Sequence, residues 1–155
     1  MKDPALLISD LQNGSIAQRK AAAGALGKYG NIGSIPALAA AIADPHPLVR
    51  CEAAQALGRL NDSSAVPPLV RALDDPETAV RAAALFALGK IRDPRSAQAI
   101  IPLLKDSAIE VRIGAATVLG KLGNKGAALP LKALRDDPFS DVREAAETAL
   151  VRLNK

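Results

Sequence analysis

An arginine recurs every 31 residues along the whole 155-residue chain. The five copies are Arg19, Arg50, Arg81, Arg112 and Arg143. Each is followed by an alanine after three residues and by a leucine after seven, and the first four by a glycine after eight. Such fixed spacing is typical of arrays whose repeats bury their apolar faces only by stacking on one another. We therefore expect a single domain over residues 1–155, made of five repeats at residues 1–30, 31–61, 62–92, 93–123 and 124–155.

Each repeat contains two stretches with the apolar spacing of a helix. In the third repeat these apolar residues are Val66, Leu69, Val70 and Leu73, followed by Val80, Ala84, Leu88 and Ile91. Steps of three and four predict two helices. Between them lies DDPE at 74–77, where we expect the proline in the first turn of the second helix and the preceding aspartate to cap it. Pro102 should either kink the first helix of the fourth repeat or mark its first turn.

The composition limits both the core and the location of the protein. Hydrophobic residues make up 49% of the chain and aromatic ones only 2%, so the core must be aliphatic, which favours closely approaching helices. No segment is long and apolar enough to span a membrane, and none has the pattern of a signal peptide. The single cysteine, Cys51, excludes an internal disulfide and fits a reducing compartment. We expect a cytoplasmic protein.

The stretch DDPETAVRAAALFALGKIRDP at 74–94 resembles the HEAT-like repeat of the phycobilisome-lyase type, and the resemblance covers nearly the whole chain. It implies an all-α, right-handed α-solenoid of five 31-residue two-helix repeats. It also implies a structural ladder along the stack, formed by an aspartate between the helices and an arginine after a valine. The matching residues are Asp44, Asp75, Asp106 and Asp137 with Arg50, Arg81, Arg112 and Arg143. Asn13 replaces the aspartate in the first repeat, so we expect a weakened rung there.

No pattern in the sequence indicates catalysis or a cofactor. His46 and Cys51 are five residues apart, whereas a helical pair of metal ligands needs three or four, and no third group orients them as a nucleophile system. Glycine-rich phosphate-binding motifs do not occur. The repeated aspartates each have an arginine at a fixed offset, which favours a structural role over a catalytic one. We expect no metal, no cofactor and no enzymatic activity.

The second helices also carry a stripe of residues that stacking leaves free. We expect this stripe one, two, five and nine residues after each arginine, on the concave side of the solenoid. The predicted partner-binding residues are Cys51, Glu52, Gln55, Arg59, Ala82, Ala83, Phe86, Lys90, Ile113, Thr117 and Lys121. Position nine is basic in every repeat, as Lys28, Arg59, Lys90, Lys121 and Arg152. These charges either form the rim of a binding groove or complement the helix dipole, and the two roles are compatible.

Three functions follow as hypotheses. The first is a monomeric, non-enzymatic scaffold that binds a protein or peptide, with Phe86 and Ile113 as apolar anchors and the basic residues engaging acidic groups. The second, which the resemblance implies, is a bilin-lyase or chaperone-like component acting on a chromophore-bearing protein. The third is nucleic-acid binding, which the sequence pI of about 9.5 favours and which the lack of stacking aromatic residues and the 16 interspersed acidic residues disfavour.

Overall fold

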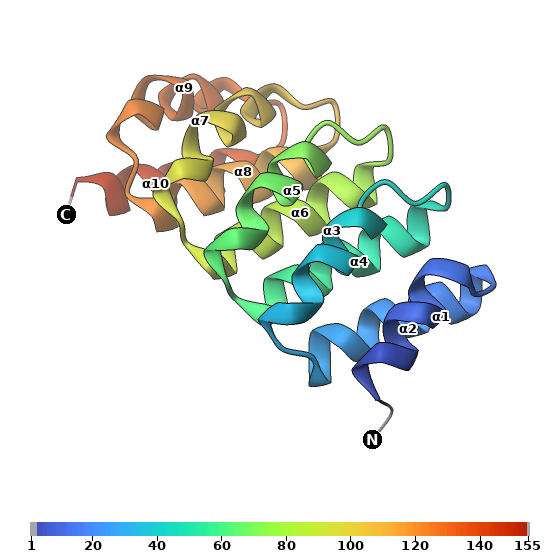
Figure 1. Ribbon diagram of the computed structural model, residues 1–155. Helices are drawn as coiled ribbons and strands as arrows, with labels where there is room; N and C mark the ends of the chain where they lie inside the picture. The colour runs from blue at the N-terminus through green and yellow to red at the C-terminus, as the bar shows by residue number, and fades with distance from the viewer. Residues whose placement is uncertain (1–2, 155) are drawn as a thin grey trace. The chain divides into compact units, whose positions relative to one another are not determined.

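A computed structural model describes residues 3–154 of the chain, and all of its regular structure there is helical (Figure 1). Over these residues it has ten α-helices, short 3₁₀ segments and no strand. The predicted all-α solenoid of two-helix repeats is therefore confirmed. Residues 1, 2 and 155 of the predicted domain lie outside the described part.

The helices form two compact units, Met1–Ile91 and Arg92–Lys155, which we call the N-terminal and C-terminal units. The first holds three of the predicted repeats and the second holds two. The boundary between the units falls within one residue of the predicted boundary between the third and fourth repeats. That the whole chain is a single domain stays a prediction.

The N-terminal unit pairs each first helix with a second helix of its own repeat. The first helices are α1 (Pro4–Asn13), α3 (Ile35–Ala41) and α5 (Val66–Ala72), and the second helices are α2 (Ile16–Tyr29), α4 (Pro47–Leu60) and α6 (Thr78–Ile91). The 3₁₀ segments η1 (Ile32–Ser34) and η2 (Ser63–Ala65) lead into α3 and α5. In this unit α2 packs on α4 and α4 packs on α6, so the second helices form one layer (Figure 1).

The C-terminal unit has the same arrangement of helix pairs, but 3₁₀ segments interrupt its first helices. Its elements are η3 (Pro94–Ser96), α7 (Ala97–Ile100), η4 (Ile101–Lys105), α8 (Ile109–Leu122), η5 (Lys125–Ala127), α9 (Ala128–Ala133), η6 (Leu134–Asp136) and α10 (Ser140–Leu153). Pro102 has no amide hydrogen to continue an α-helix, and the α-helical turn of α7 changes to 3₁₀ geometry at that point. Pro102 therefore lies in the first turn of η4, which is the second of the two predicted alternatives, and the first helix of this repeat changes type there. The second helices α8 and α10 pack on each other.

The apolar positions of the repeat form an aliphatic core. The leucine seven residues after each arginine is buried in all five repeats. These residues are Leu26, Leu57, Leu88, Leu119 and Leu150. Full burial of a leucine side chain contributes about 1.5–3 kcal/mol, which explains why this position does not vary.

The glycine eight residues after the arginine lets neighbouring second helices come into backbone contact. A Cβ atom added at Gly27, Gly58 or Gly120 would lie 2.6–2.8 Å from the Cα atom of an alanine in the next repeat. Those alanines are Ala56, Ala87 and Ala149. Real Cβ atoms do not approach other carbon atoms so closely, so any larger residue at these positions must push the two helices apart.

The predicted roles of the turn residues DDPE are wrong. Asp75 accepts a hydrogen bond from the Glu77 amide (2.9 Å), and α6 begins only at Thr78, so Asp75 and Pro76 precede the helix. In the second repeat α4 begins at Pro47, and Asp44 likewise accepts a hydrogen bond from the His46 amide (2.8 Å). The aspartate therefore closes the turn ahead of the helix and does not cap the helix itself.

None of the helices between residues 3 and 154 combines the length and the apolar character that a membrane crossing requires.

Candidate functional site

Arg19, Arg50 and Arg112 each bind an aspartate of the following repeat. Arg50 Nε lies 2.7 Å from Asp75 Oδ2, and Arg50 Nη2 lies 3.0 Å from Asp75 Oδ1. Arg19 binds Asp44 in the same two-point manner, at 2.7 and 3.0 Å. In the C-terminal unit Arg112 binds Asp137 at 2.8 and 3.1 Å. Each of these pairs joins residues 25 apart and so ties one second helix to the turn of the next repeat.

The same arginines also hold the turn of their own repeat. Arg50 Nη1 donates to the carbonyl oxygen of Asp44 at 2.9 Å. Arg81 Nη1 makes the equivalent bond to Asp75, Arg112 Nη1 to Asp106 and Arg143 Nη1 to Asp137, at 2.7–2.9 Å. Asp106 accepts a further hydrogen bond from the Ala108 amide. We call this set of arginine–aspartate contacts the arginine ladder.

The predicted weakening of the first rung is wrong. Arg19 finds its carboxylate in Asp44 of the second repeat, so the presence of Asn13 in the first repeat does not remove a partner from it. Arg19 Nη1 donates instead to the carbonyl oxygen of Gly14, which serves as the turn acceptor in the first repeat. The turn acceptor is a backbone carbonyl in the later repeats as well, so the change from aspartate to asparagine at position 13 does not remove it.

The surroundings of the ladder aspartates lower their pKa. Partial burial by itself raises the pKa of the Asp44 and Asp75 carboxyls, but hydrogen bonds from the arginine and from the turn amide outweigh it. At Asp137 the hydrogen bond from Arg112 is the largest influence and lowers the pKa directly. All three carboxylates are therefore charged in the folded chain to a lower pH than an ordinary aspartate.

This lowering predicts acid sensitivity. A carboxyl whose pKa is lower in the folded than in the unfolded chain contributes stability that is present above its unfolded pKa and is lost as the pH falls through the folded pKa. We expect the free energy of unfolding to be level from about pH 7 to about pH 5 and to fall below about pH 4. Urea unfolding at a series of pH values measures this. Asp75→Asn, which cannot titrate, should be less stable at neutral pH and should show a smaller fall in acid.

His46 and Cys51 take part in local structure. His46 Nδ1 accepts a hydrogen bond from the Leu48 amide at the start of α4. Cys51 is half-buried, burial raises the pKa of its thiol, and its sulfur lies 3.7 Å from the Ala79 carbonyl oxygen. Within residues 3–154, no three His, Cys, Asp or Glu side chains are grouped so as to hold a metal ion.

The predicted partner-binding residues of the N-terminal unit lie on its second helices and differ in exposure. Phe86 is 61% exposed, and the Lys90 ammonium group lies 5.3 Å from the centre of its ring. Arg59 is also exposed, while Cys51, Glu52, Gln55 and Ala82 are half-buried. The prediction is wrong for Ala83, which is only 6% exposed, because a one-carbon side chain does not reach past the helix packing around it.

Two charged side chains of α4 extend over the glycines of α2. Arg59 Nη2 binds Glu52 Oε1. Glu52 Oε1 lies 3.1 Å from the position that a Cβ atom on Gly24 would occupy, and Arg59 Nε lies 2.9 Å from the corresponding position at Gly27. The ion pair therefore lies where α4 packs against α2.

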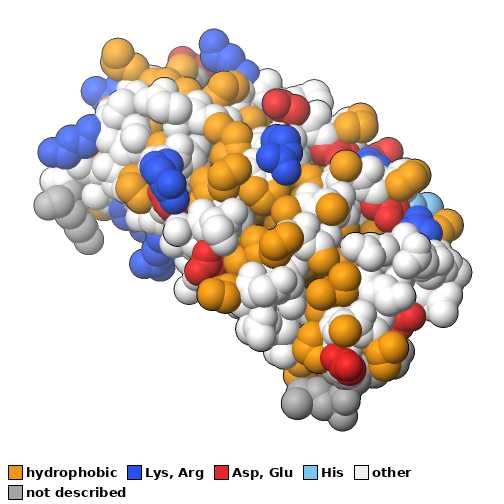
Figure 2. Space-filling model, in the orientation of Figure 1, with side chains coloured by type: hydrophobic (Ala, Val, Ile, Leu, Met, Phe, Trp, Pro, Cys, Tyr) orange, Lys and Arg blue, Asp and Glu red, His pale blue; other side chains and the backbone are white. Residues whose placement is uncertain are grey.

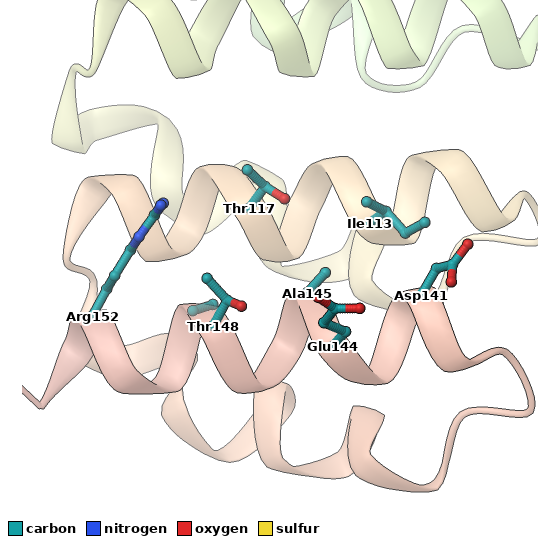
Figure 3. A pocket seen from close by; sticks show the side chains of 8 residues that line it. Ile113, Thr117, Asp141, Glu144, Ala145, Thr148 and Arg152 are labelled. Atoms are coloured by element: carbon teal, nitrogen blue, oxygen red, sulfur yellow. The ribbon is translucent and has the colours of Figure 1, made fainter.

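The C-terminal unit has an open hollow of about 250 Å³ between α8 and α10 (Figure 3). Ile113 and Thr117 line it from α8, as predicted residues of the face, whereas Lys121 is exposed outside its lining. From α10 it is lined by Asp141, Glu144, Ala145, Thr148, Ala149 and Arg152. The prediction omitted this α10 wall, although the same offsets after Arg143 identify Glu144, Ala145, Thr148 and Arg152.

Exposed apolar side chains are not confined to the second helices. Figure 2 shows hydrophobic side chains between scattered charged ones on the face seen in Figure 1. Leu6 on α1 and Leu129 on α9 are 60% and 77% exposed. A further hollow of about 500 Å³ lies between η4 and α9, lined largely by apolar residues such as Ile101, Leu104 and Leu134. Apolar exposure alone therefore does not identify the working surface.

Comparisons with known proteins identify the repeat. A family model described as HEAT repeats matches residues 4–79 and 66–151. A chain of the complex of CpcE and CpcF of phycocyanin lyase from Nostoc sp. PCC7120 is similar, with 30% identity, a TM-score of 0.86 and coverage of 99% of this chain. This chain spans 65% of the length of that one. The curated proteins contain no significant match.

Other solved structures are similar to this chain in fold only. A designed armadillo repeat protein in complex with the peptide (KR)4 has 22% identity and a TM-score of 0.73, over 96% of this chain and 80% of that one. Human deoxyhypusine hydroxylase in complex with glycerol has 17% identity and a TM-score of 0.54, over 97% of this chain and 84% of that one.

Proposed function

Because the chain belongs to the HEAT repeat family, we propose that it is a non-enzymatic scaffold whose second helices hold a protein or peptide partner. We call the residues one, two, five and nine positions after each arginine the second-helix face. In the N-terminal unit α2, α4 and α6 present this face, and in the C-terminal unit α8 and α10 present it. Repeat proteins of this kind use such extended, concave surfaces for binding.

The observation that carries the proposal is an exposed aromatic ring, that of Phe86, on the second-helix face of α6. The opposite side of α6 is fully buried at Val80, Ala84 and Leu88, so stacking accounts for that side and not for the aromatic ring. Aromatic residues are enriched among the side chains that dominate binding energy at interfaces. The equivalent positions in the other repeats are Gly24, Gln55, Thr117 and Thr148. This position is not needed for stacking and varies between repeats, so its residue can be adapted to the surface of a partner.

Replacing Phe86 tests this function. We expect Phe86→Ser to leave the melting temperature nearly unchanged, because substitutions at exposed sites usually alter stability by about 0.5 kcal/mol or less. It should reduce capture of the main partner from a lysate of the source cells at least about tenfold, as judged by quantitative mass spectrometry. The control is Leu6→Ser, which removes an equally exposed apolar side chain from the first helix α1. Equal capture by the two variants would place the binding surface elsewhere.

A second candidate function is that of a bilin-lyase or chaperone-like component. The identity of 30% with a chain of the phycocyanin lyase complex, over 99% of this chain, favours it. The basic residues of the second-helix face suit the two propionate groups of a bilin. A shift in the visible absorbance of a free bilin on addition of the protein supports this function. An unchanged spectrum, together with partner capture that depends on Phe86, favours the simple scaffold.

A further inference from the structure

We propose that the second-helix face of the N-terminal unit binds an extended acidic segment of a partner protein in polyproline II conformation, with an acidic residue at every third position. The inference rests on the proposed binding function and names the chemistry of the partner. It depends on the signs of the charges on this face, on the alignment of its basic residues and on the spacing between the helices.

The face of the N-terminal unit is strongly basic. Its four basic residues are Lys20, Lys28, Arg59 and Lys90, and its one acidic residue is Glu52. The corresponding face of the C-terminal unit carries Lys121 and Arg152 against Glu144, and Asp141 also lines its hollow, so it is less basic. Charge complementarity therefore directs an acidic partner to the N-terminal unit.

Lys28, Arg59 and Lys90 share one offset after the ladder arginine, so they lie on the same face of α2, α4 and α6. Each lies in the last turn of its helix, where any cation complements the helix dipole. To complement the helix dipole, a basic residue needs only to lie somewhere in the last turn, and it need not occupy the same position in each helix. A shared offset in three consecutive helices places the charges in one row, as recognition of a linear partner requires.

The side chains in this row remain available to a ligand. The ammonium groups of Lys28 and Lys90 lie over the rings of Tyr29 and Phe86, at 4.8 and 5.3 Å from the ring centres, which holds them near the surface without neutralising them. Arg59 binds Glu52 through Nη2, and a guanidinium group has five N–H donors, so it can also bind a second carboxylate.

The spacing between the helices selects the conformation of the partner. Packed helices lie about 8–10 Å apart, and the contact of Gly27 with Ala56 and of Gly58 with Ala87 keeps these helices close. A polyproline II helix has three residues per turn and rises about 3.1 Å per residue, so every third side chain points the same way at intervals of about 9 Å. In a β-strand alternate side chains share a face at about 6.6 Å, which does not match.

The test uses three labelled peptides of equal length and fluorescence anisotropy at low salt. The first is Asp-Pro-Pro-Asp-Pro-Pro-Asp, the second has the same composition with its aspartates contiguous, and the third replaces each aspartate of the first by lysine. We expect the first to bind at least about fivefold more tightly than the second, and the third not to bind. Equal binding of the first two, or no binding of the first, overturns the proposal.

Charge reversals then locate the site. Lys28→Glu with Lys90→Glu should weaken binding of the first peptide at least about tenfold. Arg71→Glu with Lys132→Glu changes the net charge equally, at exposed positions on the first helices α5 and α9, and should weaken binding less than about twofold. Equal losses in the two double variants mean that only net charge matters, which overturns the proposal. A short thymidine oligonucleotide that binds as tightly as the first peptide overturns it in favour of a nucleic acid.

These outcomes are distinct from those that test the proposed function. If Phe86→Ser abolishes partner capture while the acidic peptide does not bind, the scaffold function stands and the acidic, polyproline II partner is wrong. If Phe86→Ser and Leu6→Ser capture equally, the scaffold function on this face fails, whatever the peptide does.

Discussion

Gly58→Ala is expected to destabilise the N-terminal unit by about 2–3 kcal/mol, although alanine is the better helix former. In an exposed helix the same change stabilises by about 1 kcal/mol, so the sign of the effect separates packing from propensity. The new Cβ atom would lie 2.8 Å from both Cα and Cβ of Ala87, and the Cα atom belongs to backbone that cannot rotate away. Chemical unfolding of purified protein, followed by circular dichroism, measures the change.

Gly24→Ala is the matched control for this prediction. It lies in the second helix α2, and the three atoms nearest to its new Cβ atom all belong to the flexible Glu52 side chain, the closest being a carboxylate oxygen at 3.1 Å. We expect this variant to be as stable as the unchanged protein or more so. Adding Ala87→Gly to Gly58→Ala should recover part of the loss, because it removes the contact with Cβ and leaves the contact with Cα. A Gly58→Ala protein of unchanged or higher stability contradicts the close packing of α4 on α6.

Arg50→Ala is expected to destabilise the chain by about 3 kcal/mol, the usual range for removing one partner from a buried ion pair. The side chains of Arg50 and Asp75 are only 13% and 7% exposed, so the substitution leaves a carboxylate largely shielded from water without its cation. It also removes the donor to the carbonyl oxygens of Asp44 and Pro45. Urea unfolding at neutral pH measures the loss.

Arg135→Ala controls for the loss of an arginine as such. Arg135 binds Glu147 at the surface, where the two side chains are 53% and 51% exposed, and exposed pairs contribute little to stability. We therefore expect a much smaller change in the unfolding midpoint than for Arg50→Ala. A similar midpoint for the two variants would mean that the arginine ladder does not hold the repeats together.

The pairs of helices and the buried apolar positions could be predicted from the sequence. Helical apolar spacing is a local property, and the leucine seven residues after each arginine is buried wherever it occurs. Residues 47–60 and 78–91 were recognisable as helices for the same reason. The error at DDPE concerns the start of the helix, because Asp75 accepts the Glu77 amide in a turn and α6 begins only at Thr78.

The partner-binding face was predicted only as a set of offsets. The offsets identify which side of each second helix faces away from the core, and Phe86, Arg59 and Lys90 are exposed there. They do not reveal how far a short side chain reaches, and Ala83 is buried. They also do not show which charges meet, and the pairing of Arg59 with Glu52 over the glycines of α2 became evident only from the packed helices.

The sequence by itself determined the repeat and its period, because these follow from spacing along one chain, and the family resemblance indicated the ladder residues. It did not determine which aspartate each arginine binds. In a repeat of 31 residues, an aspartate six residues before the arginine and another 25 residues after it belong to the same set. The tertiary structure decided between them: Arg50 takes the carboxylate of Asp75 and the backbone carbonyl of Asp44. The physical reason is that the register between stacked helices depends on contacts between backbones, such as that of Gly58 with Ala87, which exist only once the repeats have packed.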